Sequence, residues 1–272
     1  QPWRRFILII SITNNELHLH YFDRSGLIIS RPVSIVLAPV RLLEVLNVLM
    51  LAHTNTLGFD PTMHMCDPTC KGMHTDLRQN AIGWIEGPDN AHLSIMDVLW
   101  RSQGLFSRGT IFYRVQNSSG VEFALKDCWV AEDKRYHEAT VLRMVEGIPN
   151  VVKLIADWDV HYDGAPDCTY RIRASHGICT DGFIRRFHRR ALLSPCGEPL
   201  LCYSSKPELL RSFCDFVKAH DLMLKRRVLH GDLSPNNFII HDGQGYFIDF
   251  DHAGIITDGS ECIRSHGTVS EA

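Results

Sequence analysis

The 272-residue sequence lacks any hydrophobic run long enough to cross a membrane as a helix. Its richest apolar stretch, residues 42–51, has about half of the roughly 18 residues that such a helix needs. The sequence also lacks an excess of positive charge, because 28 Lys and Arg stand against 31 Asp and Glu, a net charge of −3. We therefore expect no membrane span, and no nucleic-acid partner bound through overall basicity.

A paired cysteine framework is also missing. The nine cysteines are an odd number and are scattered along the chain, unlike the closely spaced pairs of small secreted proteins. The apolar run 6–10 follows Arg4 and Arg5, but it is too short for a signal peptide and no small-residue cleavage site follows it. This pattern favours reduced thiols and an intracellular protein, without separating cytoplasm from nucleus.

One cluster of metal-ligand residue types stands out. His64, Cys66, Cys70 and His74 supply four candidate zinc ligands within eleven residues. A proline, a glycine and flanking aspartates interrupt the cluster, and it contains no C-x-x-C pair. We favour an ordinary surface loop over a structural zinc site.

Hydrophobic periodicity and turn residues predict a mixture of strands and helices, and so an α+β fold. We expect strands at 6–12, 16–22, 27–36, 81–86, 91–98, 110–115, 121–126 and 151–156, helices at 39–52, 133–146 and 207–224, a hairpin of 238–240 with 246–248, and loops at 60–78 and 163–182. The basic run 185–190 is interpreted as a solvated loop rather than a nuclear-import or nucleic-acid patch.

The run His-Gly-Asp-Leu-Ser-Pro-Asn-Asn at 230–237 precedes the hairpin. Asp232 and Asn237 are five residues apart, and Asp249 follows twelve residues later, beyond the second strand. Phosphoryl transfer needs an oriented acceptor and neutralised phosphate charge. Asp232 can accept the proton of an acceptor hydroxyl, and the side-chain oxygens of Asn237 and Asp249 suit Mg²⁺.

A second set of residues lies upstream of this run. Lys126 ends the strand Phe-Ala-Leu-Lys and can pair with nucleotide phosphates, while Glu138 on the next helix can hold it by an ion pair. Gly104, Gly109 and Ile111 fit the spacing of G-x-G-x-x-G-x-V, with phenylalanine in place of the middle glycine. Glycines let the backbone approach phosphates closely.

In this order the motifs resemble those of eukaryotic-type protein kinases over residues 99–270, and the whole chain resembles the fungal-type protein kinase family. The resemblance is also carried by residues 4–6, 16–17, 22–26, 58–62, 108–110, 125–129 and 208–210. It implies a bilobal kinase-like fold, with an extra N-terminal β/α segment over 1–98, an N-lobe and hinge over 99–206, and an incomplete helical C-lobe over 207–272.

The same resemblance implies an ATP- and Mg²⁺-dependent protein serine/threonine kinase with a protein substrate. Its catalytic residues would be Asp232, Lys126 and Glu138, and its metal ligands Asn237 and Asp249. The nucleotide-binding residues would be Gly104, Gly109, Ile111, Lys126, Asn237 and Asp249.

The sequence departs from the kinase pattern in several places. Gly231 replaces the Arg of H-R-D, Ser234 stands where many serine/threonine kinases have a Lys, and Asp251 replaces the Gly of D-F-G and so limits the backbone freedom of that turn. Residues 267–269 resemble the start of the substrate-docking segment, and the sequence stops at residue 272. We therefore expect a C-terminally truncated kinase domain that binds nucleotide poorly or turns over slowly.

Two other functions stay open. Small-molecule phosphotransferases of the aminoglycoside or choline kinase type share His-Gly-Asp-Leu, lack the catalytic-loop Lys and often carry a metal strand like Ile248-Asp249-Phe250. A catalytically inactive pseudokinase fragment that acts by binding is the third hypothesis. The N-terminal residues of the resemblance favour the protein kinase.

Overall fold

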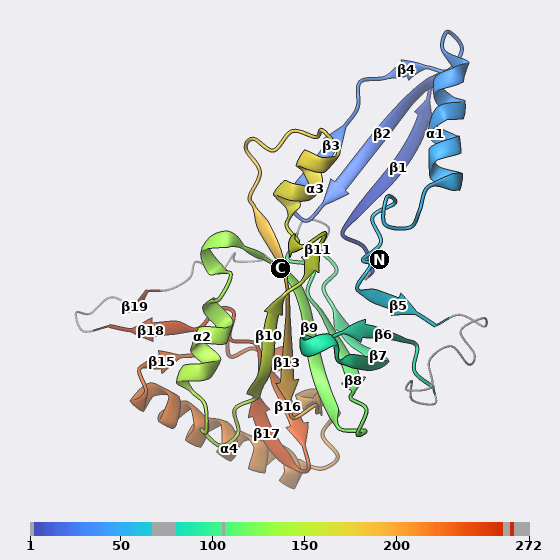
Figure 1. Ribbon diagram of the computed structural model, residues 1–272. Helices are drawn as coiled ribbons and strands as arrows, with labels where there is room; N and C mark the ends of the chain where they lie inside the picture. Colours follow the sequence, from blue (N-terminus) through green and yellow to red (C-terminus); the bar gives the residue numbers. More distant parts are fainter. Residues whose placement is uncertain (1–2, 67–79, 105–106, 258–261, 264–272) are drawn as a thin grey trace. The chain divides into compact units, whose positions relative to one another are not determined.

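The computed structural model describes residues 3–66, 80–104, 107–257 and 262–263 (Figure 1). The chain divides into two compact units. The first unit comprises Gln1–Tyr113, Asp127–Glu132 and Asp159–Arg189, and the second comprises Arg114–Lys126, Asp133–Trp158 and Arg190–Ala272. Strands outnumber helices, and the predicted α+β class is confirmed. The predicted domain boundaries after residues 98 and 206 stay predictions.

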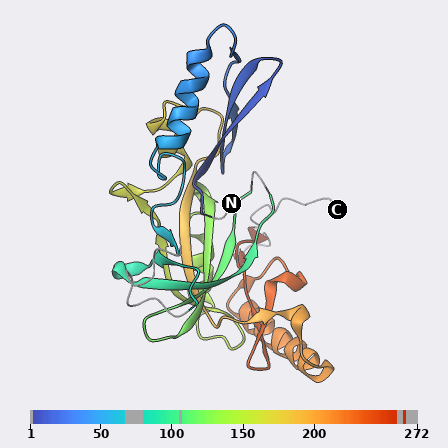
Figure 2. The same cartoon turned by 90° about the vertical axis from the view of Figure 1, so that its right-hand side faces the viewer.

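The first unit begins with a small antiparallel sheet. Its strands are β1 (Phe6–Thr13), β2 (Glu16–Asp23), β3 (Gly26–Ile29) and β4 (Val33–Ser34), with β2 pairing all three others. The turn between β1 and β2 places Asn14 and Asn15 at positive φ angles of 51° and 60°, which asparagine tolerates and which suit a two-residue hairpin. Helix α1 (Pro39–Leu51) runs beside this sheet, as Figures 1 and 2 show.

A seven-stranded sheet follows in the order β10-β13-β9-β8-β7-β6-β5. Its strands are β5 (Met63–Met65), β6 (Gly83–Glu86), β7 (His92–Arg101), β8 (Ile111–Gln116), β9 (Glu122–Ala131), β10 (Lys153–Asp159) and β13 (Arg186–Ser194). Strand β5 lies inside the stretch predicted as loop 60–78. Strand β13 corrects the prediction of a solvated loop at 185–190, because His188, Arg189 and Arg190 are buried.

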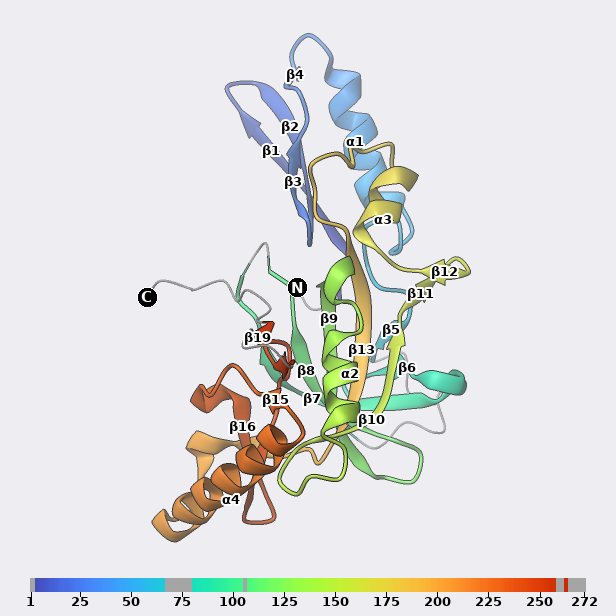
Figure 3. The ribbon, with the colours of Figure 1, turned by 90° about the vertical axis from the view of Figure 1, so that its left-hand side faces the viewer.

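The second unit contains helices α2 (His137–Met144) and α4 (Lys206–Lys225). Ser205 caps α4 by accepting a hydrogen bond from the backbone N–H of Glu208 at 3.3 Å. The helix packs on β17 (Gln244–Phe247), which forms a hairpin with β16 (Phe238–His241). Figure 3 labels α4 and β16. The Phe216 ring of α4 lies 4.3 Å from Phe238 and 5.6 Å from Phe247.

Short elements complete the two units. They are β11 (His161–Tyr162), β12 (Ala165–Pro166), α3 (Thr169–Ser175), β14 (Glu198–Pro199), β15 (Val228–Leu229), β18 (Gly254–Ile256) and β19 (Cys262–Ile263). Helix α3 lies in the stretch predicted as loop 163–182, and its Ile172 and Arg173 are buried. No helix among the described residues is both long and apolar enough to span a membrane.

The predicted zinc cluster is only partly described. His64 lies in β5, and its ring stacks on Trp84 at a centroid distance of 3.8 Å. Cys66 lies just after that strand, and its backbone N–H donates to the carbonyl oxygen of Ile82 at 3.0 Å. Cys70 and His74 lie outside the described residues.

Candidate functional site

Lys126 lies near the middle of β9, and its side chain is completely buried. Its Nζ is 2.8 and 2.9 Å from the two carboxylate oxygens of Glu138. It also donates to Oδ1 of Asp249 at 2.8 Å and to Oδ2 of Asp251 at 2.7 Å. A buried ammonium needs such partners, because removing it from water is costly. We call these four residues, all of the second unit, the Lys126 network.

Helix α2 positions Glu138 in its first turn. The helix is anchored through a buried face made of Ala139, Val141 and Leu142. His137 Nε2 lies 2.8 Å from the carbonyl oxygen of Ala253, and the backbone N–H of Phe250 donates to Oε1 of Glu138 at 3.3 Å. Both contacts tie the start of α2 to the segment that carries Asp249 and Asp251.

The charges of the Lys126 network do not balance. Burial and the carboxylates of Asp251 and Asp249 raise the pKa of Glu138 to about 7, although the Lys126 ammonium acts in the opposite direction. One oxygen from each of Glu138, Asp249 and Asp251 lies within 4.8 Å of the others. Hard carboxylate oxygens gathered in this way fit Mg²⁺, and a divalent cation would relieve their mutual repulsion.

The predicted catalytic loop follows β15. His230 is buried against the rings of Phe247 and Phe250, and its Nε2 lies 3.0 Å from the carbonyl oxygen of Ile248. Burial lowers the pKa of His230. Gly231 has a positive φ of 82°, and a Cβ built on it would overlap the carbonyl oxygen of His252. The backbone path therefore explains why no arginine, nor any other side chain, stands at this position.

Asp232 and Asn237 are linked by the loop itself. The side-chain amide of Asn237 donates to the backbone carbonyl of Asp232 at 3.2 Å, and Asp232 Oδ1 accepts from the backbone N–H of Ser234 at 3.2 Å. Asn237 is buried at the end of a short 3₁₀ helix, Pro235–Asn237. The backbone carbonyl oxygen of Asn237 accepts a hydrogen bond from the backbone N–H of Ile248 at 3.0 Å. This bond places Asn237 beside the residue that precedes Asp249.

Asp249 occupies a strained position just after β17. Its φ angle is +58°, in a region that non-glycine residues seldom adopt. Its side chain is 24% exposed, whereas that of Asp251 is 8% exposed. Within the Lys126 network, solvent therefore reaches Asp249 more readily than Asp251. The sequence alone showed Asp251 as a restriction on the turn and gave no sign of its contact with Lys126.

The predicted glycine loop lies between β7 and β8, in the first unit. The backbone N–H of Ser102 donates to the carbonyl oxygen of Thr110 at 2.9 Å and closes the loop. Gly109 has a positive φ of 59°, and Ile111, at the start of β8, is buried. Gly104 accepts a hydrogen bond from the Ser107 hydroxyl at 2.9 Å.

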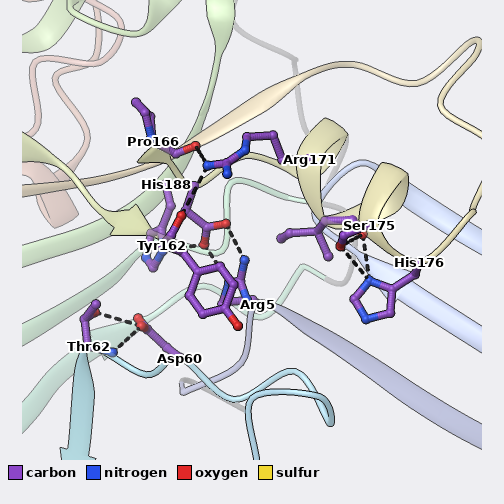
Figure 4. Close-up of polar contacts among 11 residues, drawn as sticks. Arg5, Asp60, Thr62, Tyr162, Pro166, Arg171, Ser175, His176 and His188 are labelled. Carbon is purple, nitrogen blue, oxygen red and sulfur yellow. Dashed lines mark hydrogen bonds and ion pairs between the residues drawn. The ribbon is translucent and has the colours of Figure 1, made fainter. Parts of the chain in front are cut away.

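The first unit also holds a buried ionic cluster that the sequence did not reveal. Arg5 makes two hydrogen bonds to the Asp167 carboxylate, at 2.7 and 2.6 Å. His188 Nε2 lies 2.6 Å from Oδ1 of Asp127, and its Nδ1 lies 3.6 Å from Asp167. We call Arg5, Asp127, Asp167 and His188 the His188 network; Figure 4 shows Arg5 and His188 on either side of Tyr162.

Ion pairing sets the protonation of the His188 network. Burial alone would lower the pKa of His188, but the charge of Asp127, the hydrogen bond to Asp127 and the nearby Asp167 carboxylate raise it to about 9. Burial likewise opposes the ionised form of Asp167, and the contacts with His188 and Arg5 nevertheless bring its pKa below the usual range. Two cations therefore face the two carboxylates of this network, and a third buried carboxylate, Asp60, lies within 4.8 Å of Asp127 and His188.

Two comparisons with known proteins place the chain. No curated protein matches it. The family model described as fungal protein kinase matches residues 1–270. The chain therefore belongs to the fungal protein kinase family, as its motifs predicted.

Proposed function

We propose that this chain transfers the γ-phosphoryl group of ATP to serine or threonine hydroxyls of a protein. Family membership supports kinase-type phosphotransfer. The observation that carries the proposal is the fully buried Lys126, held at once by Glu138 and Asp249. An ammonium fixed in this way can present positive charge to nucleotide phosphates without first reorganising.

Each residue has a role that follows from its position. Lys126 binds the phosphates, and Glu138 positions Lys126. Asn237 and Asp249 would hold Mg²⁺, which would supply charge neutralisation at the phosphates. Gly104, Gly109 and Ile111 would line the nucleotide, since a glycine backbone can approach phosphates closely.

The transfer step exchanges one phosphorus–oxygen bond for another. The acceptor hydroxyl oxygen forms a bond to the γ-phosphorus, while the bond from that phosphorus to the β,γ-bridging oxygen breaks and ADP leaves. Asp232 accepts the proton of the hydroxyl and orients its oxygen, and this proton later passes to solvent. The N–H of Ser234 and the amide of Asn237 fix the conformation of the Asp232 loop.

A small-molecule phosphotransferase is the second candidate. Gly231 has no room for a side chain, so the loop cannot hold the arginine of H-R-D. Ser234 also brings no charge near the transferred group, unlike the lysine of many serine/threonine kinases. Both features fit an enzyme that transfers phosphate to an amino-alcohol, and the acceptor therefore has to be tested directly.

The first experiment is Mg·ATP binding by thermal shift. We expect Mg·ATP to raise the melting temperature of the wild-type chain and to have no effect on Lys126→Ala or Asp249→Asn. Lys153→Ala and Asp242→Asn are the matched controls, because both side chains are exposed in the same unit. These controls should respond like the wild type.

The second experiment offers labelled ATP with serine- and threonine-containing peptides, and separately with amino-alcohols. Transfer to the peptides supports the proposal, and transfer to amino-alcohols alone supports the second candidate. A cooperatively folded wild-type chain that neither binds Mg·ATP nor transfers phosphate would contradict both enzymatic functions and leave a pseudokinase.

A further inference from the structure

The first unit contains a cavity of about 160 Å³ at the edge of the glycine loop. Four arginines from distant parts of the sequence line it, namely Arg4, Arg5, Arg24 and Arg101. Asp23 is the one acidic residue among its described lining residues. This composition is strongly cationic, although the whole chain has a net charge of −3.

Asp23 does not neutralise the arginines that line the cavity, because its carboxylate is hydrogen-bonded to groups that are not lining residues. Both carboxylate oxygens of Asp23 accept hydrogen bonds from Arg173, at 2.6 and 2.8 Å, and Oδ1 also accepts from the backbone N–H of Ser25. Arg5 in turn is matched by Asp167. These pairs cancel each other's charge, and the remaining positive charge of the cavity comes from the other arginines.

Besides Arg4, whose guanidinium donates to the backbone carbonyl of Leu57 at 2.7 Å, Arg24 and Arg101 supply that remaining charge. In the part of the chain that the structure describes, neither forms an ion pair. Arg24 is partly buried, and burial lowers the pKa of its guanidinium, although the charge of Asp127 acts in the opposite direction. The carboxylate of Asp127 is hydrogen-bonded to His188. A partly desolvated cation without a paired anion is costly, and an anionic ligand would relieve that cost.

The guanidinium of Arg24 lies directly on Gly109. A Cβ built on Gly109 would overlap the Cζ, Nε and Nη1 atoms of Arg24. Ser107 Oγ links the two glycines, because it donates to the carbonyl of Gly104 and accepts from the N–H of Gly109. The absence of a side chain at Gly109 therefore makes room for Arg24 beside the backbone.

We propose that this cavity binds a phosphate monoester through Arg24 and Arg101. Guanidinium groups recognise phosphate oxygens through paired charge-assisted hydrogen bonds, and a cavity with several arginines suits a dianion better than a single carboxylate. Two sources share this chemistry, namely the phosphates of a nucleotide and a separate phosphate monoester. The face of Gly109 that lies in this cavity is filled by the Arg24 guanidinium and is not left open to nucleotide phosphates, and this arrangement favours a separate phosphate monoester.

The test measures binding of O-phosphoserine and of inorganic phosphate by calorimetry at low ionic strength. We expect both probes to bind the wild-type chain, and Arg101→Glu and Arg24→Ala to weaken O-phosphoserine binding by about tenfold or more. Arg101 is exposed, so its substitution tests the cavity even if Arg24→Ala disturbs the fold. Arg31→Glu, another exposed arginine of the first unit, is the matched control and should bind like the wild type.

Two further arms separate this site from the nucleotide. The Asp249→Asn variant should bind O-phosphoserine with unchanged affinity, and ADP should not displace O-phosphoserine from the wild type. Displacement by ADP would overturn the proposal, because the cavity would then belong to the nucleotide. Equal loss of binding in Arg31→Glu and Arg101→Glu would also overturn it, because the effect would reflect net charge alone.

Discussion

The two buried ionic networks of this chain use the same kinds of groups in different ratios. In the Lys126 network, one ammonium contacts three carboxylates. In the His188 network, an arginine and a protonated histidine face two carboxylates. The side chains of the His188 network are all at most 7% exposed, whereas Asp249 is 24% exposed. The first network has one cation for three carboxylates and is open, whereas the second has two cations, lies beside one further buried carboxylate, Asp60, and is closed.

This difference indicates which of the two networks a ligand can bind. A closed buried network that contains its own two cations offers little access to a cation from solvent, so we expect it to act on the stability of the unit that holds it. An anionic network with one accessible carboxylate keeps an uncompensated negative charge until a cation or a cation-bound nucleotide binds to it. The comparison therefore predicts that substitutions in the two networks have separable consequences.

Replacing the lysine of the Lys126 network should have the largest effect. Lys126→Met leaves three carboxylates around an uncharged side chain, and we expect the free energy of unfolding at pH 7 to fall by about 3–5 kcal/mol. Phosphoryl transfer should fall by at least about 10²-fold, because a charge that stabilises the transition state is lost. Urea unfolding and labelled-ATP assays measure both effects.

Lys153→Met is the control for that substitution, because Lys153 is exposed in β10. It should leave stability and transfer near their wild-type values. A Lys126→Met chain as stable as the wild type at pH 7 would contradict the anionic character that we assign to the network.

A substitution in the His188 network should affect stability without abolishing nucleotide binding. Arg5→Met removes the bidentate partner of Asp167, and we expect a loss of about 3–4 kcal/mol in the free energy of unfolding. At temperatures where the variant is folded, Mg·ATP should still raise its melting temperature. Arg31→Met is the exposed control. Loss of the Mg·ATP response in folded Arg5→Met would remove the distinction between the two networks.

The contrast also shows which features of the fold and the site could be predicted from the sequence. Turns are encoded locally, so Asn14-Asn15 and Asp242-Gly243 predicted two hairpins whose positive φ angles the structure shows. The Lys126–Glu138 pair was predictable because the residues lie on consecutive elements, with spacing that matches a known motif. Both cases depend on short-range or familiar patterns.

Other features depend on partners far away in the sequence. Strand β13 was missed because its arginines and histidine look solvated until their acids are known. His188 contacts Asp127, 61 residues away, and Arg189 contacts Asp159, 30 residues away. The contact between Asp251 and Lys126 spans 125 residues and belongs to no familiar motif. Charge compensation over such separations is a property of the tertiary structure.

The pH dependence of stability should reveal the His188 network. The folded pKa of His188 is about 9 and its ordinary value is 6.5, so the folded state binds the proton more tightly. Its contribution is complete below pH 6.5 and is lost as pH rises to 9, with a total of about 3 kcal/mol. Urea unfolding between pH 6 and pH 10 measures the decline.

The matched variants for this experiment are His188→Gln and His53→Gln, the latter at an exposed site in the same unit. The first should flatten the decline between pH 6.5 and 9, and the second should retain it. An unchanged slope in His188→Gln would show that another group is responsible.

The smallest effect should come from reducing the excess negative charge of the Lys126 network. Since burial and the carboxylates of Asp251 and Asp249 together raise the pKa of Glu138 to about 7, stability should decrease as pH rises from 4.5 to 7. Asp251→Asn removes one of these carboxylates, so this decrease in stability should shrink by about 1 kcal/mol.

The same substitution should also raise the Mg²⁺ concentration that gives half of the Mg²⁺-dependent thermal shift. Asp242→Asn, with a side chain 91% exposed, should change neither quantity. If Asp251→Asn instead tightens Mg²⁺ binding, Asp251 is not a ligand of the cation, and its carboxylate serves only to hold Lys126.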